Sequence, residues 1–147
     1  MSLTNPLAKM SKSENEDTGR VLLMDDPAVI MKQFKRAITD SDTENCVRYD
    51  PENKPGVANL MTIYSAVTGK SYDEIEREFD GLGYGKFKPA VGEVVVEMLR
   101  PIREETQALL KDKAYLESVY RDGAQKASCV AEKTLRKVYK KVGFLAR

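Results

Sequence analysis

Apolar residues recur at helical spacing along most of this 147-residue chain, and helix-capping residues separate the runs. Asp26 and Pro27 mark one start, since aspartate is a favoured N-cap and proline at the first helical position gives up only an N–H that has no partner there. Ser71 and Glu74 form a capping-box pair, and Gly69 is a natural helix stop. With no convincing hairpin pattern beside these signals, the sequence predicts an all-α fold.

Six helical segments are predicted. They cover residues 27–39, 56–68, 71–79, a long segment through 91–110, and residues 112–120 and 122–142. Pro89 suits the first turn of the long segment, whereas Pro101 falls inside it and should kink or interrupt it. The short apolar run from Arg20 to Met24 is either a strand or the end of a loop, and its length does not separate the two. Val47 and Tyr49 should anchor the polar connection around them.

The composition limits the classes of function. No apolar run approaches a membrane span or a signal peptide, so we expect a soluble, cytoplasmic protein without a membrane partner. Histidine is absent, which excludes histidine-based catalytic triads and the usual zinc sites, and no metal site is predicted. Cys46 and Cys129 are isolated and should be reduced, buried or half-buried residues. Neighbouring carboxylates such as Asp25 and Asp26 are attributed to caps and solvated faces.

A basic loop stands near the start of the chain, Lys9-Met10-Ser11-Lys12-Ser13. Two ammonium groups interleaved with two hydroxyls, and followed by a charged segment that contains glycine, suit a mobile surface loop. Such a loop can close on a phosphate, because the lysine ammonium is a compact charge on a flexible stem. In isolation, a solvated basic loop would be the favoured interpretation of these five residues.

Six further sequence motifs along the chain change this interpretation of the loop. In chain order they are Leu23–Pro27, Arg36–Asp42, Arg48–Pro51, Lys54–Leu60, Tyr84–Lys88 and Leu99–Ile102. With the lysine loop, at these spacings, they closely resemble the C-terminal part of bacterial tryptophanyl-tRNA synthetases, which are class I aminoacyl-tRNA synthetases. The loop matches the KMSKS signature of that class at all five positions, and the resemblance runs from about Asn5 to Gly143.

The resemblance implies that two regions of the chain have different functions. Residues 1–24 would be the KMSKS loop and a remnant of a Rossmann-type catalytic domain, and residues 25–147 a helical bundle that binds the anticodon. The histidine-containing adenylate-binding motif of the class is not in this sequence. We therefore expect part of a larger enzyme that does not catalyse alone, and we interpret residues 1–3 as an added start.

For the loop, the resemblance implies contact with ATP. Lys9 and Lys12 would be the catalytic residues, touching the ATP phosphates as tryptophanyl-adenylate forms. The ATP phosphate-binding loop would comprise Lys9, Met10, Ser11, Lys12 and Ser13. In the intact enzyme Mg²⁺ would be held mainly by the ATP phosphates, and this chain should bind neither tightly.

The C-terminal region is strongly basic. From residue 121 to 147 there are eight bases and two acids, a local charge of 8 − 2 = +6, whereas the whole chain carries +1. Such a stripe is either an RNA footprint or a solvated face, and the residues alone do not decide. The resemblance favours tRNA(Trp), with the candidate residues Arg121, Lys126, Lys133, Arg136, Lys137, Lys140 and Lys141. Tyr115, Tyr120 and Tyr139 are candidate base-stacking platforms or, alternatively, core residues.

The resemblance also names partners for the intact enzyme. It would be a tryptophan–tRNA ligase of protein biosynthesis that takes ATP, tryptophan and tRNA(Trp), works as a homodimer and binds no DNA. The oligomeric state of this chain stays open. A freestanding RNA-binding or protein-interaction module derived from a synthetase is the alternative, and the related tyrosyl enzymes fit less well because their lysine loop usually differs in its central residues.

Overall fold

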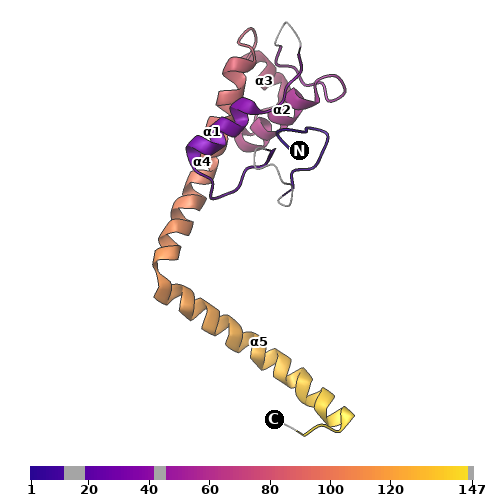
Figure 1. Ribbon diagram of the computed structural model, residues 1–147, viewed down its shortest axis with the longest axis vertical. Helices are drawn as coiled ribbons and strands as arrows, with labels where there is room; N and C mark the ends of the chain where they lie inside the picture. Colours follow the sequence, from indigo (N-terminus) through magenta and orange to yellow (C-terminus); the bar gives the residue numbers. More distant parts are fainter. Residues whose placement is uncertain (12–18, 42–45, 146–147) are drawn as a thin grey trace. The chain divides into compact units, whose positions relative to one another are not determined.

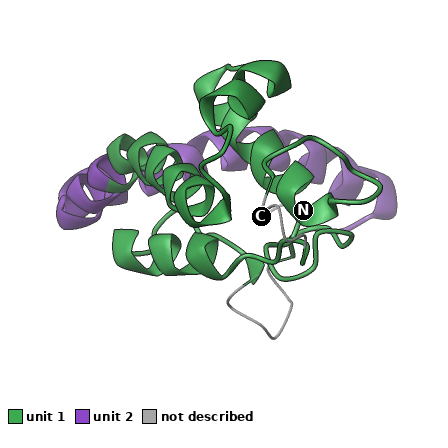
Figure 2. Ribbon diagram, turned by 90° about the horizontal axis from the view of Figure 1, so that it is seen from above, with its two compact units in different colours: residues 1–103 green, residues 104–147 purple. Residues whose placement is uncertain are grey.

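The computed structural model describes residues 1–11, 19–41 and 46–145, which contain five α-helices and no strand (Figure 1). The helices are α1 (Pro27–Arg36), α2 (Pro55–Thr68), α3 (Tyr72–Glu78), α4 (Tyr84–Lys111) and α5 (Lys113–Val142). The all-α prediction is confirmed. The chain divides into two compact units, Met1–Arg103 and Glu104–Arg147, so α4 begins in the first unit and ends in the second (Figure 2).

The residues predicted to cap the helices are found at the helix ends in the structure. The Asp26 side chain accepts a hydrogen bond from the amide of Ala28 at 2.8 Å. At α3 both halves of the capping box are present, and the Ser71 amide donates to the Glu74 carboxylate at 2.8 Å. Gly69 ends α2 in the left-handed conformation, with φ of 76°, which glycine adopts without a Cβ penalty. These local signals were readable from the sequence.

Helix α1 ends at Arg36, earlier than the predicted Thr39. The backbone leaves the helix because the Ile38 amide donates to the carbonyl of Leu3 at 2.8 Å instead of to a preceding turn of α1. The same segment passes close to Gly56, where an added Cβ would overlap with the Ile38 carbonyl. A long-range backbone contact therefore sets the end of this helix.

The two long helices are more continuous than predicted. Helix α4 starts at Tyr84, before Pro89, because Tyr84 and Phe87 are buried in the core, and it runs on through Pro101 without interruption. Helix α5 unites the two segments predicted at 112–120 and 122–142. Asp112 caps it as expected, accepting from the Tyr115 amide at 2.9 Å. Inside a long helix, aspartate and glycine cost only about 1 kcal/mol or less each, so residues 122 and 123 do not stop it.

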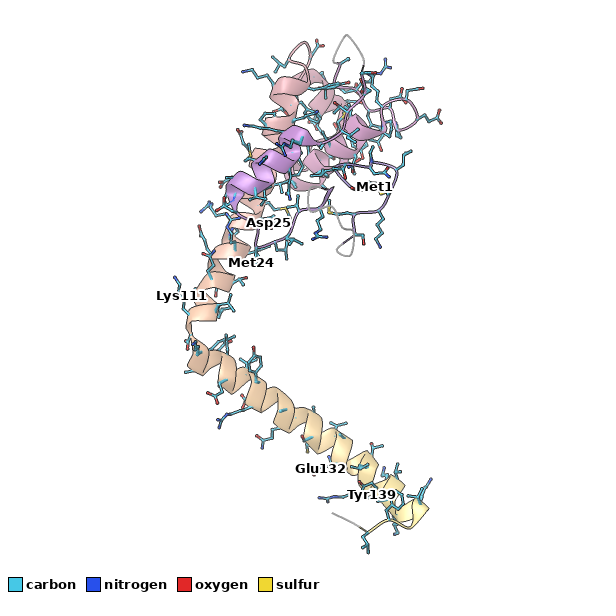
Figure 3. The ribbon with its side chains drawn as sticks, in the orientation of Figure 1. Met1, Met24, Asp25, Lys111, Glu132 and Tyr139 are labelled. Carbon is cyan, nitrogen blue, oxygen red and sulfur yellow. The ribbon has the colours of Figure 1, made fainter. Side chains whose placement is uncertain are left out.

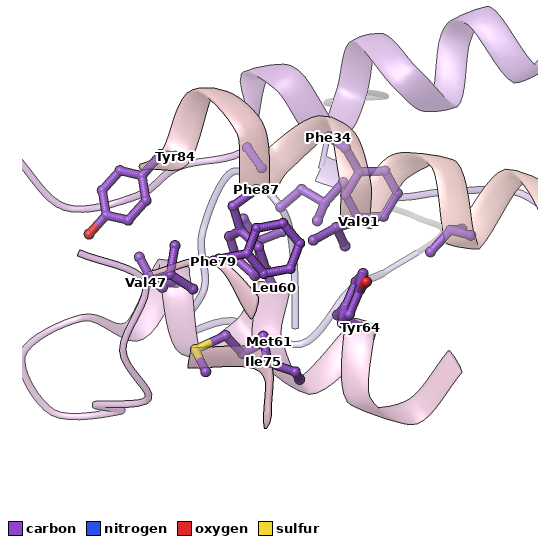
Figure 4. Packing of buried hydrophobic residues seen from close by; sticks show 14 of the residues in the cluster. Phe34, Val47, Leu60, Met61, Tyr64, Ile75, Phe79, Tyr84, Phe87 and Val91 are labelled. Atoms are coloured by element: carbon purple, nitrogen blue, oxygen red, sulfur yellow. The ribbon is translucent and has the colours of Figure 1, made fainter. Parts of the chain in front are cut away.

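The core lies entirely in the first unit and is centred on aromatic rings (Figure 4). Phe79 and Phe87 meet edge to face with ring centroids 4.9 Å apart, and Tyr64 meets Phe79 in the same way at 5.6 Å. Around them pack aliphatic residues of α1, α2, α3 and α4: Ile30, Val57, Leu60, Met61, Ile75, Val91, Val95 and Leu99. Helix α5, by contrast, buries no residue.

The structure bears on three sequence expectations, one of which it corrects. Ser2 and Leu3 belong to the core, each only 1% exposed, whereas Met1 is 51% exposed, and the interpretation of residues 1–3 as an added start stays a prediction. Of the two alternatives for the run from Arg20 to Met24, the end of a loop is confirmed, since the run forms no strand and leads into a turn closed by the Asp25 amide on the Leu22 carbonyl at 3.1 Å. Finally, both cysteines are exposed rather than buried.

A buried polar network ties the connection between α1 and α2 to the start of α4. The Tyr84 hydroxyl lies 2.7 and 3.0 Å from the two oxygens of the Asp40 carboxylate and 3.1 Å from the Cys46 carbonyl. The Lys54 ammonium donates to the same hydroxyl at 3.2 Å and lies 3.5 Å from Asp40. Because Lys54 is only 6% exposed, its charge depends on these two partners.

Replacing Tyr84 by phenylalanine should lower the free energy of unfolding by about 1–3 kcal/mol, since Asp40, Lys54 and the Cys46 carbonyl all lose a partner in a buried place. Urea denaturation followed by circular dichroism measures this. Tyr120→Phe is the matched control, because Tyr120 is 69% exposed and should change stability by less than about 0.5 kcal/mol. Equal effects of the two substitutions would contradict the role given to the network.

Tyr84 should also make stability fall in strongly alkaline solution. Burial and the hydrogen bond to Asp40 raise the pKa of Tyr84 from 10.0 to about 12. The folded state thus holds a proton that the unfolded chain releases at lower pH, so this stabilisation is complete below pH 10 and is lost as the pH rises towards 12. Urea titrations between pH 9 and 12 should show the stability difference between the wild-type chain and Tyr84→Phe shrinking over that window. A stability difference that stays constant from pH 9 to 12 would contradict the stabilisation assigned to protonated Tyr84.

Candidate functional site

The base of the lysine loop is a compact turn held by backbone bonds. The Ser2 amide donates to the Ala8 carbonyl at 2.9 Å, and the Ala8 amide donates to the Asn5 carbonyl at 2.9 Å. On the far side of the loop, the Leu3 amide donates to the Gly19 carbonyl at 2.9 Å. The two ends of the loop, at residues 3 and 19, are therefore joined directly.

Gly19 is required at this junction for space. A Cβ on Gly19 would lie 2.6 Å from the Ser2 hydroxyl oxygen and 2.6 Å from the Thr4 hydroxyl oxygen. These two hydroxyls are themselves within hydrogen-bonding distance, 3.2 Å, so they have little freedom to move aside. Only a residue without a side chain closes the loop in this way.

Asn59 of α2 holds the same junction from the helical side. Its side-chain oxygen accepts from the Met1 nitrogen at 3.0 Å, and its side-chain nitrogen lies 3.3 Å from the carbonyl oxygens of both Met1 and Ser2. The side chain is 8% exposed, so these bonds form largely out of water. Through Asn59, a core helix fixes the backbone that leads into the loop.

Of the five predicted loop residues, the structure describes Lys9, Met10 and Ser11. Met10 packs against the core, whereas Lys9 beside it is exposed and joins no other described residue. Ser11 is half-buried. Lys12 and Ser13 lie outside the described residues. An anchored methionine next to an exposed ammonium fits a loop that offers a cation to a phosphate.

The predicted tRNA-binding residues all lie on α5 and are exposed to solvent. Figure 3 draws the side chains that project from this helix. Two of them are engaged within the helix. Arg121 pairs with Glu117 at 2.7 Å, and Arg136 pairs with Glu132 at 3.8 Å. The others, Lys126, Lys133, Lys137, Lys140 and Lys141, form no ion pair with a described residue.

The three tyrosines predicted as stacking platforms differ in their surroundings. Tyr115 and Tyr120 are 51% and 69% exposed. Tyr139 instead meets Phe144 edge to face, with centroids 5.7 Å apart. Of the three, Tyr115 and Tyr120 are thus the more accessible to a base.

Sequence reasoning did not identify Asn59, Gly19 or the Asp40–Lys54–Tyr84 network as important to the site. Asn59 carried one usable signal, a polar residue between Ala58 and Leu60 in a predominantly apolar helix, because a buried amide needs partners. The partners of Asn59, however, lie 57 and 58 residues away.

No described helix is long and apolar enough to cross a membrane. Within the described ranges, no group of three or more histidine, cysteine, aspartate or glutamate residues is arranged to hold a metal ion.

Comparisons with known proteins cover nearly all of the chain. Residues 1–100 match the family model described as tRNA synthetases class I (W and Y). A tryptophan–tRNA ligase of Clostridium tetani (strain Massachusetts / E88) is 49% identical over 99% of the chain, and one of Mycobacterium leprae (strain TN) is 47% identical over 97%. The chain spans only 42% and 41% of the length of these two relatives.

Solved structures agree with the sequence comparisons. The tryptophanyl-tRNA synthetase of Campylobacter jejuni, solved in complex with ADP and tryptophan, matches 98% of the chain with a TM-score of 0.77 and 27% identity. The enzyme of Mycoplasma pneumoniae matches 99% with a TM-score of 0.73 and 27% identity. The chain covers 44% and 43% of these two proteins.

Replacing Gly19 by alanine should disrupt the base of the loop. The added Cβ must displace the Ser2 and Thr4 hydroxyls, so we expect a loss of about 1–3 kcal/mol in the free energy of unfolding and faster hydrogen exchange at the Leu3 amide. Gly85→Ala is the control, because nothing lies within 4 Å of its added Cβ, and alanine favours the helix there. If hydrogen exchange at the Leu3 amide is unchanged in Gly19→Ala, the role given to Gly19 at the base of the loop is wrong.

Proposed function

The chain belongs to the class I tRNA synthetases of the tryptophan and tyrosine group, and on that premise we propose that it forms the KMSKS-loop and helical tRNA-binding part of a tryptophan–tRNA ligase. One observation carries the proposal: 47–49% identity to two tryptophan–tRNA ligases over 97–99% of this chain. The intact enzyme would activate tryptophan with ATP and transfer it to the terminal adenosine of tRNA(Trp). That intact enzyme would be a homodimer in the cytoplasm.

The lysine loop would serve the activation step. As tryptophanyl-adenylate forms, negative charge builds up on the departing pyrophosphate, and Lys9 and Lys12 would neutralise it. The exposed ammonium of Lys9, which contacts no other residue that the structure describes, supports this role, as does the packing of its neighbour Met10 against the core. Mg²⁺ would enter on the ATP phosphates.

This chain alone should not form the adenylate. It spans about two fifths of its relatives' length, and it lacks the histidine-containing motif that the resemblance assigns to adenylate binding. The loop therefore supplies one part of a phosphate clamp whose other parts belong to the remainder of the enzyme. Binding of the anticodon arm is the role that the helical region would keep on its own.

Binding to tRNA tests the proposal directly. The chain should bind tRNA with a tryptophan anticodon more tightly than the same tRNA with an altered anticodon, by about 1–3 kcal/mol, the range typical of a lost base-reading contact. Filter binding or fluorescence anisotropy across a salt series measures both affinities. The preference should persist as salt rises, because base contacts do not depend on released counterions. Equal affinities, or no binding at low salt, would overturn the proposal.

A further inference from the structure

Helix α5 separates its side chains onto three faces. With 3.6 residues per turn, successive residues are about 100° apart, which assigns each position of α5 to a side of the helix. One face is apolar or small and carries Leu116, Gly123, Ala127, Val130 and Val138. Most of the charged residues of α5 occupy the remaining two faces.

The first charged face is neutralised within the helix. Glu117, Arg121, Glu132 and Arg136 fall within about 100° of one another. Both i,i+4 ion pairs of α5 lie here, Arg121 with Glu117 and Arg136 with Glu132. The two arginines thus already have anionic partners one turn away.

The second charged face is a row of unpaired lysines. Lys126, Lys133, Lys137 and Lys140 fall within about 60° around the helix and extend over about 21 Å of its axis. All four are exposed and form no ion pair with a described residue. This lysine row concentrates positive charge, and the one carboxylate of α5 on its side is that of Asp122, one turn before Lys126.

From this separation we infer that the lysine row, and not the two arginines, binds the phosphate backbone of tRNA. The inference rests on the proposed function and narrows its seven candidate residues to these four. Lysine ammoniums spaced by one or two turns along one side of a helix act as point charges, which suits a chain of phosphates better than the edges of bases. Each contact releases condensed counterions and so makes the affinity depend on salt.

The row has a defined N-terminal limit. Tyr115 lies on the same side of α5, but Asp122 lies between it and Lys126, and a carboxylate repels a phosphate. The proposed contact therefore begins at Lys126. Lys141 lies towards the apolar face and is not part of the row.

The test compares two double variants of the chain that remove equal charge from the same helix. Lys133→Gln with Lys137→Gln should reduce the slope of log affinity against log salt concentration by about 1.4–1.8, which is 0.7–0.9 for each lost phosphate contact. The reduction should be the same for tRNA with the tryptophan anticodon and with an altered one. Arg121→Gln with Arg136→Gln should leave the slope within experimental error of the wild-type value.

The outcomes separate this inference from the proposed function. If the slope changes equally in both double variants, or only in the arginine variant, the lysine row is not the phosphate-binding surface. The proposed binding of tRNA by the chain would still stand. Absence of tRNA binding by the wild-type chain overturns both. Circular dichroism shows whether the helix survives, and glutamine at these exposed positions should preserve it.

Discussion

The attachment of the first residues to α2, with Ser2 and Leu3 buried, is the constraint on which the arrangement of the loop depends. Asn59 must satisfy its side-chain amide in a place that is 8% exposed, and the backbone of Met1 and Ser2 provides the partners. Once that backbone is fixed, Leu3 bonds to Gly19 on one side and to Ile38 on the other. The base of the loop and the end of α1 therefore follow from one buried hydrogen-bonding site, because leaving such groups unpaired costs about 1–3 kcal/mol each.

The first unit and α5 are stabilised in different ways. The first unit has an aromatic core, with Phe79 and Phe87 in edge contact, and a buried network around Tyr84 that joins distant segments. Helix α5 buries nothing and relies on local features, namely the Asp112 cap, the left-handed Gly143 and two i,i+4 ion pairs. Local features of this kind contribute a few tenths to about 1 kcal/mol each. Its side chains are correspondingly free to serve contact with another molecule.

The two proposed contacts with phosphate use lysine in different settings. In the loop, Lys9 follows a turn that is bonded to the core, so its position is set while its side chain remains mobile enough to follow a leaving group. On α5, the regular rise of the helix sets the spacing of four lysines, and their positions do not depend on the core. A flexible charge suits the chemical step, and a fixed row suits binding of an extended polyanion.

What the sequence determined by itself was local. The Asp26, Ser71 and Asp112 caps and the Gly69 stop were all legible, because each depends on residues within a few positions. The early end of α1, the burial of Ser2 and Leu3 and the need for Gly19 were not, because they depend on contacts between residues 15 to 58 positions apart. Only the tertiary structure brings such residues together. The same reason explains the exposed apolar residues of α5, since periodicity marks a face and only packing decides whether that face is buried.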